Sequence, residues 1–435
     1  MGLLECNADV VRLMLRYLAQ ADLRSICLVH PGLRALGEPL LYSRITIRFY
    51  QSHPHPITSL LRSILRRPEL AAHIRILFCY IGDLQTRYPE GKVPKIPMPE
   101  MDLRQAVSFV EATCLPFRNT WIKELRQGTL DAYMAFLLSW LPRLQQLHVS
   151  DPFSVESSLI GHVLQSILCG SRSDWLTADI STSLSELRRV TFGRLRVTLV
   201  RNTESVLLFF YLPSVESLRI SIDDPLVHIL PWPTTQPPSA LSLTLLSIAG
   251  GKLRESYFGQ ILAAVPRLRS LPWHCKRNLE DQLNSPLVNL DQLMPSLAHV
   301  KETLTELSIG GVNVCPAPPR LQGSARALAG FDQLTKLSIP LVFLTGFALP
   351  LRSGFRNCLP RNLEELTLTD ALSFDEECDE ACAAEIATWL ADMRTSTPRL
   401  WKLCLLFEDA DLDEILELAR QAGLEVTTEG ARHNY

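Results

Sequence analysis

The chain has 435 residues, of which 47% are hydrophobic and 20% are charged, and its 43 basic and 46 acidic side chains leave a formal charge of −3. This balance gives no reason to expect nucleic acid or an anionic membrane as a partner. Apolar runs such as 206–212 are too short to span a bilayer, and the first residues lack the basic and long apolar regions of a secretory signal.

The cysteines indicate a reducing compartment. There are 11 of them, an odd number, and they are scattered singly. Several, such as Cys27, Cys169 and Cys404, stand among leucines. No disulfide framework is visible in this pattern, so we expect a cytoplasmic or nuclear protein.

Residues 1–43 are expected to form a small helical unit. The stretch 10–18 is apolar except for Arg12 and Arg16, and Asn7 or Asp9 can cap its start. A second helix is predicted over 23–29, and Pro31 opens or breaks a short third one. A helix that is apolar nearly all round must be covered on both sides, either by the rest of the chain or by another protein.

These residues resemble an F-box, the trihelical motif of about forty residues that docks a Skp-type adaptor. Val10-Val11 stand for the family's aliphatic pair, Met14-Leu15 for its Ile-Leu and Leu18 for the closing leucine. Asp22-Leu23 matches the family's Asp-Leu, and Leu28-Val29 its Leu-Val. Cys6-Asn7 occupies the family's Leu-Pro position, Asp9 that of its Glu, and Leu33 that of its Trp. The stretch 39–47 is similar to F-box proteins of filamentous fungi.

The resemblance implies a function without catalysis by this chain. It implies that the protein is the substrate-recognition subunit of a Skp–cullin–F-box ubiquitin ligase, in which the helices hold the adaptor and thereby a cullin. The adaptor-binding residues it implies are Asn7, Asp9, Val10, Val11, Met14, Leu15, Leu18, Leu23, Leu28, Val29 and Leu33. The alternative is an interaction scaffold outside the ubiquitin pathway whose first helices only cap the following domain.

Residues 44–140 are predicted to form a capping region. The alternation 45–49 predicts a strand, 57–65 a short amphipathic helix, and 74–80 an irregular first repeat strand. Four prolines between 84 and 102 predict a surface loop, which is either filler or an adaptable binding loop. Helices are expected over 103–115 and 130–141.

Residues 141–435 repeat one hexad, Leu-x-x-Leu-x-Leu. Its last two apolar positions are two apart and therefore share one face of a strand, while the residue between them faces away. The hexads are 144–149, 187–192, 215–220, 243–248, 268–273, 304–309, 334–339, 363–368 and 400–405. Most neighbouring copies start 25 to 30 residues apart, near the upper end of the range of about 20–29 typical of leucine-rich repeats.

This spacing leaves room for a helix between strands. We therefore predict an α/β fold, namely a leucine-rich-repeat solenoid with a curved parallel sheet and helices on its convex side, preceded by the three-helix F-box-like unit. A generic α/β sheet with leucine-rich strands is the alternative. The solenoid would hold a protein substrate on its sheet or edge loops. Near the C-terminus, 376–393 and 411–421 are expected to be helices, and 424–426 a last strand.

Three tryptophans near strand ends are candidate anchors for a partner. Trp232 lies in a proline-rich break at 223–239 and is the best candidate substrate-binding residue. Core filling is favoured for Trp401 and still more for Trp273.

No catalytic, cofactor-binding or metal-binding signature is found in the sequence. Gly-x-Ser-x-Gly, His-Glu-x-x-His and phosphate-loop patterns are missing. Cys378 and Cys382 are four apart, but no histidine or further cysteine is near them in sequence, so buried thiols are favoured over a zinc site.

Overall fold

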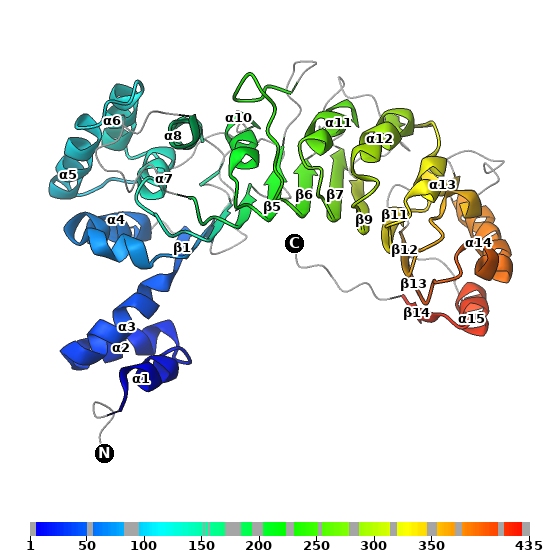
Figure 1. Cartoon of the computed structure of the whole chain (residues 1–435), viewed down its shortest axis with the longest axis horizontal. Coiled ribbons are helices and arrows are strands. Elements are labelled where there is room, and N and C mark those ends of the chain that lie inside the picture. The colour runs from blue at the N-terminus through cyan, green and yellow to red at the C-terminus, as the bar shows by residue number, and fades with distance from the viewer. Residues whose placement is uncertain are drawn as a thin grey trace. The chain divides into compact units, whose positions relative to one another are not determined.

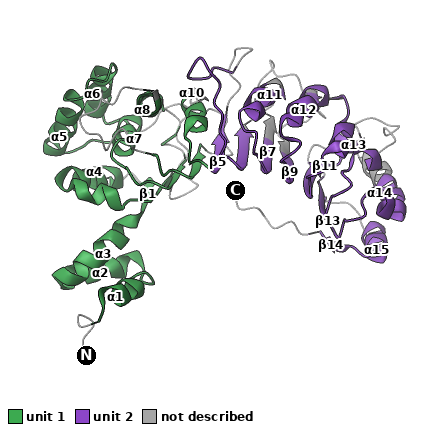
Figure 2. Cartoon of the chain, in the orientation of Figure 1, with its two compact units in different colours: residues 1–193, 199–215 green, residues 194–198, 216–435 purple. Residues whose placement is uncertain are grey.

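The computed structural model places the chain in two compact units. It describes residues 6–49, 55–81, 95–150, 153–154, 157–169, 184–193, 203–222, 230–250, 255–277, 287–313, 320–345, 355–369, 376–407 and 413–428. Unit 1 comprises residues 1–193 and 199–215, and unit 2 comprises residues 194–198 and 216–435 (Figure 2). The boundaries predicted after residues 43 and 140 both lie inside unit 1.

Unit 1 begins with helices and then alternates strands with helices (Figure 1). Its elements are α1 (Ala8–Leu15), α2 (Gln20–Val29), α3 (Pro31–Ser43), β1 (Arg44–Phe49), α4 (Pro56–Arg66), η2 (Pro68–His73), β2 (Ile76–Ile81), α5 (Glu100–Glu111), α6 (Arg118–Gln127), α7 (Leu130–Leu138), β3 (Gln146–Val149), α8 (Ser158–Cys169), β4 (Arg189–Phe192), α10 (Thr203–Leu207) and η4 (Leu208–Tyr211).

Unit 2 continues the alternation with shorter helices between several strands. Its elements are β5 (Ser217–Ser221), β6 (Leu245–Gly250), α11 (Glu255–Ala263), β7 (Ser270–Arg277), β8 (Leu287–Asn289), α12 (Leu290–Leu297), η5 (Ala298–Val300), β9 (Glu306–Asn313), β10 (Arg320–Gln322), η6 (Ala325–Gly330), β11 (Lys336–Pro340), α13 (Val342–Thr345), η7 (Phe355–Cys358), β12 (Glu365–Thr369), α14 (Glu376–Ser396), β13 (Lys402–Leu406), α15 (Asp413–Gln421) and β14 (Glu425–Thr427).

The main strands of each unit are parallel neighbours in chain order. In unit 1 the order is β1-β2-β3-β4, and in unit 2 it is β5-β6-β7-β9-β11-β12-β13-β14. Equivalent hexad positions lie side by side, so that Leu307 pairs with Leu337, Leu337 with Leu366 and Leu366 with Leu403. All nine predicted hexads contain a strand. The two-stranded parallel sheet of β8 and β10 lies outside the hexads and was not predicted.

The apolar hexad positions form the core because parallel strands with in-register partners send the same side chains inward. All three apolar positions are buried in hexads such as Leu363, Leu366 and Leu368, each 0% exposed. The intervening Thr367 is only partly buried. The first hexad position lies before the strand, where a turn closes by a hydrogen bond from its N–H to the carbonyl three residues back, as from Leu400 to Thr397 at 3.2 Å.

A regular backbone ladder joins successive repeats just before each strand. The N–H of the second hexad residue donates to the corresponding carbonyl of the preceding repeat, as from Thr305 to Arg269 (2.9 Å) and from Thr335 to Thr305 (2.9 Å). The hydroxyls of these two threonines donate to the same carbonyls at 3.0 and 3.2 Å. The turns are thus paired as fully as the strands, and no buried N–H of the turn is left unsatisfied at these positions.

In unit 2 the strands follow an arc, and the helices lie on its outer side (Figure 1, Figure 2). The α/β class and the parallel sheet are therefore confirmed. Assignment to the leucine-rich-repeat and F-box families stays a prediction. None of the described helices has the length and apolar character needed to cross a membrane.

One expectation for unit 1 was wrong, and one helix was not predicted. The proline-rich segment 84–102 is not a surface loop throughout, because Ile96 and Met98 are buried and α5 already begins at Glu100. Helix α6 was missed. It ends at Gly128, whose φ of 75° and close approach to the Ile96 carbonyl suit glycine. Residues 82–94 lie outside the described residues.

Candidate functional site: the N-terminal helical unit and the outward sheet faces

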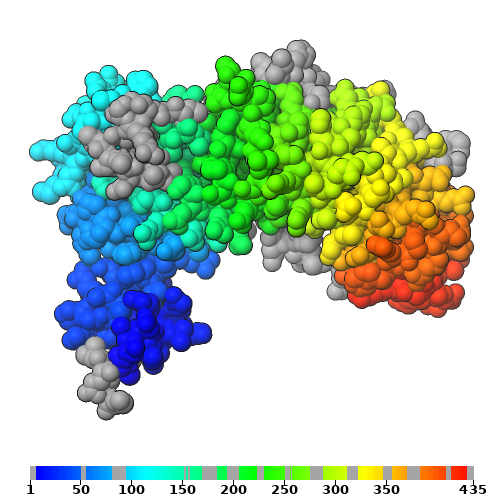
Figure 3. Space-filling view, in the orientation of Figure 1, coloured from blue at the N-terminus to red at the C-terminus, as the bar shows by residue number. Residues whose placement is uncertain are grey.

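Helices α1, α2 and α3 form a unit with a core of its own, and local signals start each helix. The Asn7 side chain accepts a hydrogen bond from the Asp9 N–H (2.8 Å) and so caps α1. His30 Nδ1 accepts from the Gly32 N–H (3.0 Å) at the start of α3, where Pro31 fits the first turn. In the space-filling view these helices form a lobe of unit 1 with α1 on its surface (Figure 3).

Four of the predicted adaptor-binding residues lie inside this lobe. Val11, Leu15, Leu23 and Leu33 are 2–7% exposed and form one cluster. Leu18 packs against the same cluster and is partly buried. These residues therefore fix how the three helices pack.

The other predicted residues are exposed. Val10 and Met14 are 50% and 53% exposed on α1, and Leu28 and Val29 are 80% and 75% exposed at the end of α2. Asn7 and Asp9 are also exposed. Sequence reasoning missed Leu13 (53% exposed) and Tyr17 (85%), although their spacing from Val10 and Met14 could have revealed them. Positions 10, 13, 14 and 17 have the spacing i, i+3, i+4, i+7; the first three lie on one face of α1, and Tyr17 lies in the turn directly after the helix. We name these four residues the apolar stripe of α1.

Helix α1 has three different faces. With about 100° of rotation per residue, Val10, Leu13 and Met14 lie roughly a third of a turn from the buried face of Val11 and Leu15. Arg12 and Arg16, one turn apart, occupy the remaining third. Arg12 Nη1 contacts Asp9 Oδ1 at 3.2 Å, and both side chains are largely exposed. One short helix thus presents an apolar surface and a basic surface in different directions.

The lobe is fixed to the rest of unit 1 by charged and polar contacts. Arg67 donates two hydrogen bonds to the Glu38 carboxylate, at 2.6 and 2.8 Å, and a third to Glu69 at 2.8 Å. The hydrogen bonds from Arg67 lower the pKa of Glu38 below its ordinary value, against the opposing effect of its burial. Gln20 Nε2 donates to the carbonyls of Leu41 and Arg44. Helix α3 also runs directly into β1, so no linker separates the lobe from the sheet of unit 1.

The outward face of β1 to β3 is basic and aromatic. The Arg44 guanidinium lies 4.9 Å from the centre of the Phe78 ring, and the Phe78 ring lies 5.6 Å from that of His148. Arg48 lies over Tyr80 and its Nε donates to the Tyr80 hydroxyl at 2.7 Å. Among the described outward positions of β1 to β4 there is no carboxylate. This face offers positive charge and flat rings to solvent.

The outward face of unit 2 is different, because its charges alternate in sign across five neighbouring strands. By register, Glu306 pairs with Lys336, Lys336 with Glu365, Glu365 with Lys402, and Lys402 with Glu425. The hydrogen bond to Glu365 raises the pKa of Lys336. The next outward row consists of the small residues Ser308, Ser338, Thr367, Cys404 and Thr427.

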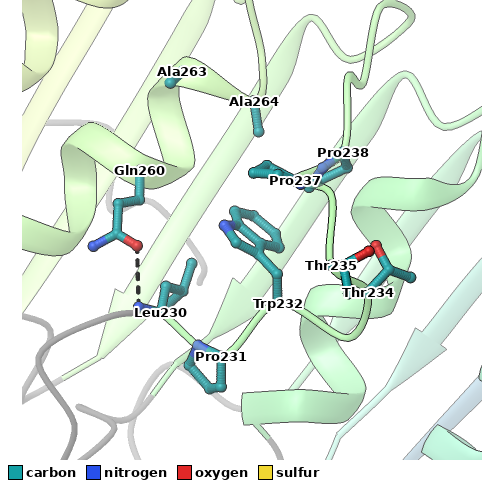
Figure 4. A pocket seen from close by; sticks show the side chains of 10 residues that line it. All are labelled: Leu230, Pro231, Trp232, Thr234, Thr235, Pro237, Pro238, Gln260, Ala263 and Ala264. Carbon is teal, nitrogen blue, oxygen red and sulfur yellow. Dashed lines mark hydrogen bonds between the residues drawn. The ribbon is translucent and has the colours of Figure 1, made fainter.

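Trp232 lies in the helix layer of unit 2. It is half-buried in a pocket of about 500 Å³, beside Pro237 and near Ala264 of the segment that follows α11 (Figure 4). The Leu230 N–H donates to Gln260 Oε1 of α11 at 3.0 Å and holds this loop on the helix. The Trp232 side chain is therefore not part of the outward sheet face, although it remains partly accessible in the proline-lined pocket.

Core positions were expected for the other two candidate tryptophans, and this was correct for Trp273 and wrong for Trp401. Trp273 is 2% exposed and packs at 4.5 Å between ring centres on Phe258, as expected of a core residue. Trp401 is 45% exposed, with Lys402 Nζ 5.8 Å from its ring centre. Trp401 occupies the second hexad position, which points away from the core. Its place next to the buried Leu400 therefore did not indicate burial of Trp401 itself.

Two buried carboxylates, Asp131 and Asp102, have structural partners. Asp131 accepts hydrogen bonds from the N–H groups of Leu159 and Ile160 and from Ser158 Oγ, which caps α8. Asp102 pairs with Arg62 at 2.6 Å. Within the described residues no group of three or more metal-binding side chains occurs. The side chains of Cys378 and Cys382 lie outside the described set.

Comparisons with known proteins add no relative. No protein-family model matches the chain, and no curated protein matches its sequence. The functional argument therefore rests on the geometry above and on the resemblance of the N-terminal residues.

Proposed function

We propose that the chain is the substrate-recognition subunit of a Skp–cullin–F-box ubiquitin ligase. The three N-terminal helices would dock the Skp-type adaptor, and the outward sheet faces would hold a protein substrate in the cytoplasm or nucleus. Such a subunit works by proximity, since it holds a substrate lysine near the conjugating enzyme and needs no chemistry of its own side chains.

One observation carries this proposal, namely the apolar stripe of α1 on a lobe that already has a complete core. Val11 and Leu15 face that core at 2% exposure, while Val10 and Met14, next to them in sequence, remain half exposed. Exposed apolar side chains gathered on one helix face are typical of a docking surface. Four such residues in one stripe match the requirement for a partner that covers α1.

The scaffold alternative predicts that the first repeats cover these residues. A cap that only shields the sheet would bury Val10 and Met14 against it, yet they are 50% and 53% exposed. Helix α3 makes the contacts that a cap would make, through Glu38 and Arg67. The capping role therefore fits α3, and it does not account for the exposed apolar stripe.

The proposal is tested by the affinity of the intact chain for a purified Skp-type adaptor, measured by calorimetry. We expect binding, and we expect Val10→Asp/Met14→Asp to weaken it about thirtyfold or more, because central apolar contacts typically contribute at least about 2 kcal/mol. The matched control is Met101→Asp/Leu241→Asp, which replaces two apolar residues that are 68% and 52% exposed elsewhere. It should bind like the intact chain.

A folded chain that does not bind the adaptor would favour the scaffold. Equal losses in the test and control variants would show that the added charge, and not the stripe, caused the effect. Circular dichroism of each variant separates loss of the surface from loss of the fold.

A further inference from the structure

The pocket beside Trp232 is built mainly on residues 230–238, between β5 and β6 of unit 2. It has a volume of about 500 Å³ and is lined by ten described residues. Its walls combine the half-buried indole of Trp232 with three proline rings and with two alanines, Ala263 at the end of α11 and Ala264 just after it (Figure 4). One flat aromatic ring and several aliphatic rings therefore surround a single hollow in the helix layer.

Hydrogen bonds hold this loop in place on both sides of the pocket. Before it, the Leu230 N–H donates to Gln260 Oε1 of α11 at 3.0 Å, and after it the Ala240 N–H donates to the Ala264 carbonyl at 2.8 Å. The Trp232 N–H donates to the Leu230 carbonyl at 2.8 Å. The prolines restrict the backbone further, because their rings fix φ. The pocket is therefore largely formed before a ligand arrives, which lowers the entropic cost of binding.

The chemistry of the walls selects an uncharged ligand. None of the ten lining residues has an ionisable side chain, and the polar side chains among them are Thr234, Thr235 and Gln260. A charged group placed here would lose its water without gaining an ionic partner from the wall. The side-chain oxygen of Gln260 already accepts from the Leu230 N–H. A ligand is therefore held mainly by apolar contacts.

The loop is unsuited to binding a partner by β-sheet pairing. Pro231, Pro233, Pro237 and Pro238 have no N–H, so the row of backbone donors that a strand needs is interrupted. A protein segment must therefore be bound by packing of its side chains. A polyproline II segment suits this requirement, because it needs no backbone hydrogen bonds and its rings pack in sites lined by aromatic side chains.

We propose that this pocket binds an uncharged, proline-containing segment of another protein in the polyproline II conformation. A proline ring of that segment lies against the indole of Trp232. Such a segment is already restricted before binding, so little conformational entropy is lost on either side of the contact. The pocket is in the helix layer and not on the outward sheet face of unit 2, so a protein bound to that sheet face leaves it accessible. The site does not depend on the ligase function.

The test measures binding of short fluorescent peptides to the full chain without adaptor, by fluorescence anisotropy. One peptide pool has proline at every third position among random uncharged residues, and two matched pools have alanine or leucine at those positions. We expect the proline pool to bind, and the other two pools to bind about tenfold more weakly or less.

The decisive variant is Trp232→Ala, which removes the indole. It should weaken the selected proline peptide about tenfold or more, because a buried aromatic anchor typically dominates such a contact. Trp232→Phe keeps a flat ring and should retain part of the affinity. Ala263→Glu places a charge on the wall without removing any part of the loop, and it should also weaken binding.

The matched control is Trp401→Ala, which removes another partly exposed indole of unit 2, 45% exposed in the intact chain. It should bind the proline peptide as the intact chain does, and circular dichroism checks that each variant is folded. The proposal is overturned by equal binding of the leucine pool, by no binding of any pool, by full affinity in Trp232→Ala, or by equal losses in Trp232→Ala and Trp401→Ala.

This proposal and the proposed function fail in different ways. A chain that binds the proline pool but no adaptor would keep the pocket and remove the ligase. A chain that binds adaptor but no proline peptide would do the reverse. Because α1 and the pocket belong to different units, Val10→Asp/Met14→Asp should leave the peptide affinity unchanged, and Trp232→Ala should leave the adaptor affinity unchanged.

Discussion

Strands β1 to β3 of unit 1 and strands β9, β11, β12, β13 and β14 of unit 2 share the same alternation of inward apolar and outward side chains, yet their outward sides differ in chemistry. In unit 1 the outward side chains are arginines stacked on Phe78 and Tyr80, with no carboxylate among the described positions. In unit 2 glutamate and lysine alternate from strand to strand, so that each lysine lies between two glutamates. The inward pattern therefore sets the fold, while the outward residues are free to specialise. The charge of the outward face therefore favours unit 1 for binding an anionic partner.

The largest expected effect on the free energy of unfolding concerns the buried inward positions that both units share. Leu77→Ala in unit 1 and Leu366→Ala in unit 2 each empty a fully buried position. We expect each to lower the free energy of unfolding by about 2–5 kcal/mol, measured by urea denaturation. The outward neighbours provide the controls, since Thr46→Ala and Thr367→Ala should change it by no more than about 0.5 kcal/mol. A similar cost for the threonines would break the division between inward and outward residues.

The next effect concerns unit 1, where Arg67 pairs with the partly buried Glu38 and with the more exposed Glu69. Because the folded-state pKa of Glu38 is lowered, chiefly by hydrogen bonds from Arg67, its contribution is fully present above its unfolded pKa of about 4.3. It is lost as the pH falls through the lower folded value. We expect Glu38→Gln to destabilise the helical lobe by about 1–2 kcal/mol at neutral pH and to reduce this acid sensitivity.

Hydrogen exchange in α1 to α3, followed from neutral pH to below the usual glutamate range, measures this effect. Glu69→Gln removes the more exposed carboxylate held by the same arginine and should have a smaller effect. Equal behaviour of the two variants would contradict the special role of Glu38.

A further prediction concerns binding to the two outward faces. Replacing Arg44→Ala/Arg48→Ala should weaken the affinity of the chain for an acidic peptide such as oligoglutamate about tenfold, or about 1.4 kcal/mol, measured by fluorescence anisotropy. Lys336→Ala/Lys402→Ala in unit 2 should leave it nearly unchanged, because both lysines already lie between glutamates. The reverse ranking would contradict the charge difference between the faces.

The smallest effect lies within the alternating row of unit 2. Lys336→Glu places three like charges side by side with Glu306 and Glu365, and we expect a loss of about 0.5–1 kcal/mol in unfolding free energy. The double variant Lys336→Glu/Glu306→Lys restores an opposite pair at that step, leaves one like pair with Glu365, and should recover part of the loss in a double-mutant cycle. No coupling between the two positions would show that solvent screens the row completely.

The sequence predicted the strands well because one short pattern states both their position and their inward side. All nine hexads held strands, and the last strand, after Gly423, was also found. Helix α6 was missed because its segment has many polar side chains around Trp121, Ile122 and Leu125, and only these three are buried. Strands β8 and β10 are three residues each and pair only with one another, so no periodicity shows them.

The candidate site was predicted less completely for a physical reason. The F-box resemblance marked residues by type, and apolar residues at 10, 11, 14 and 15 look alike in sequence, although 11 and 15 are buried and 10 and 14 are not. Only helix rotation relative to the other two helices separates them. Arg16, Arg75 and Arg143 line one cleft of unit 1 although they come from distant segments, and no local sequence pattern contains that information.

The alternating row of unit 2 also constrains how such a chain can grow. Glutamate and lysine repeat every two strands across Glu306, Lys336, Glu365, Lys402 and Glu425, whereas the backbone repeats every strand. Deleting one internal repeat would bring two like charges together, while deleting two adjacent repeats would keep the alternation. Gene duplications in this part of the molecule are therefore expected to survive more readily in pairs, and an engineer who lengthens or shortens the array should do so by an even number of repeats.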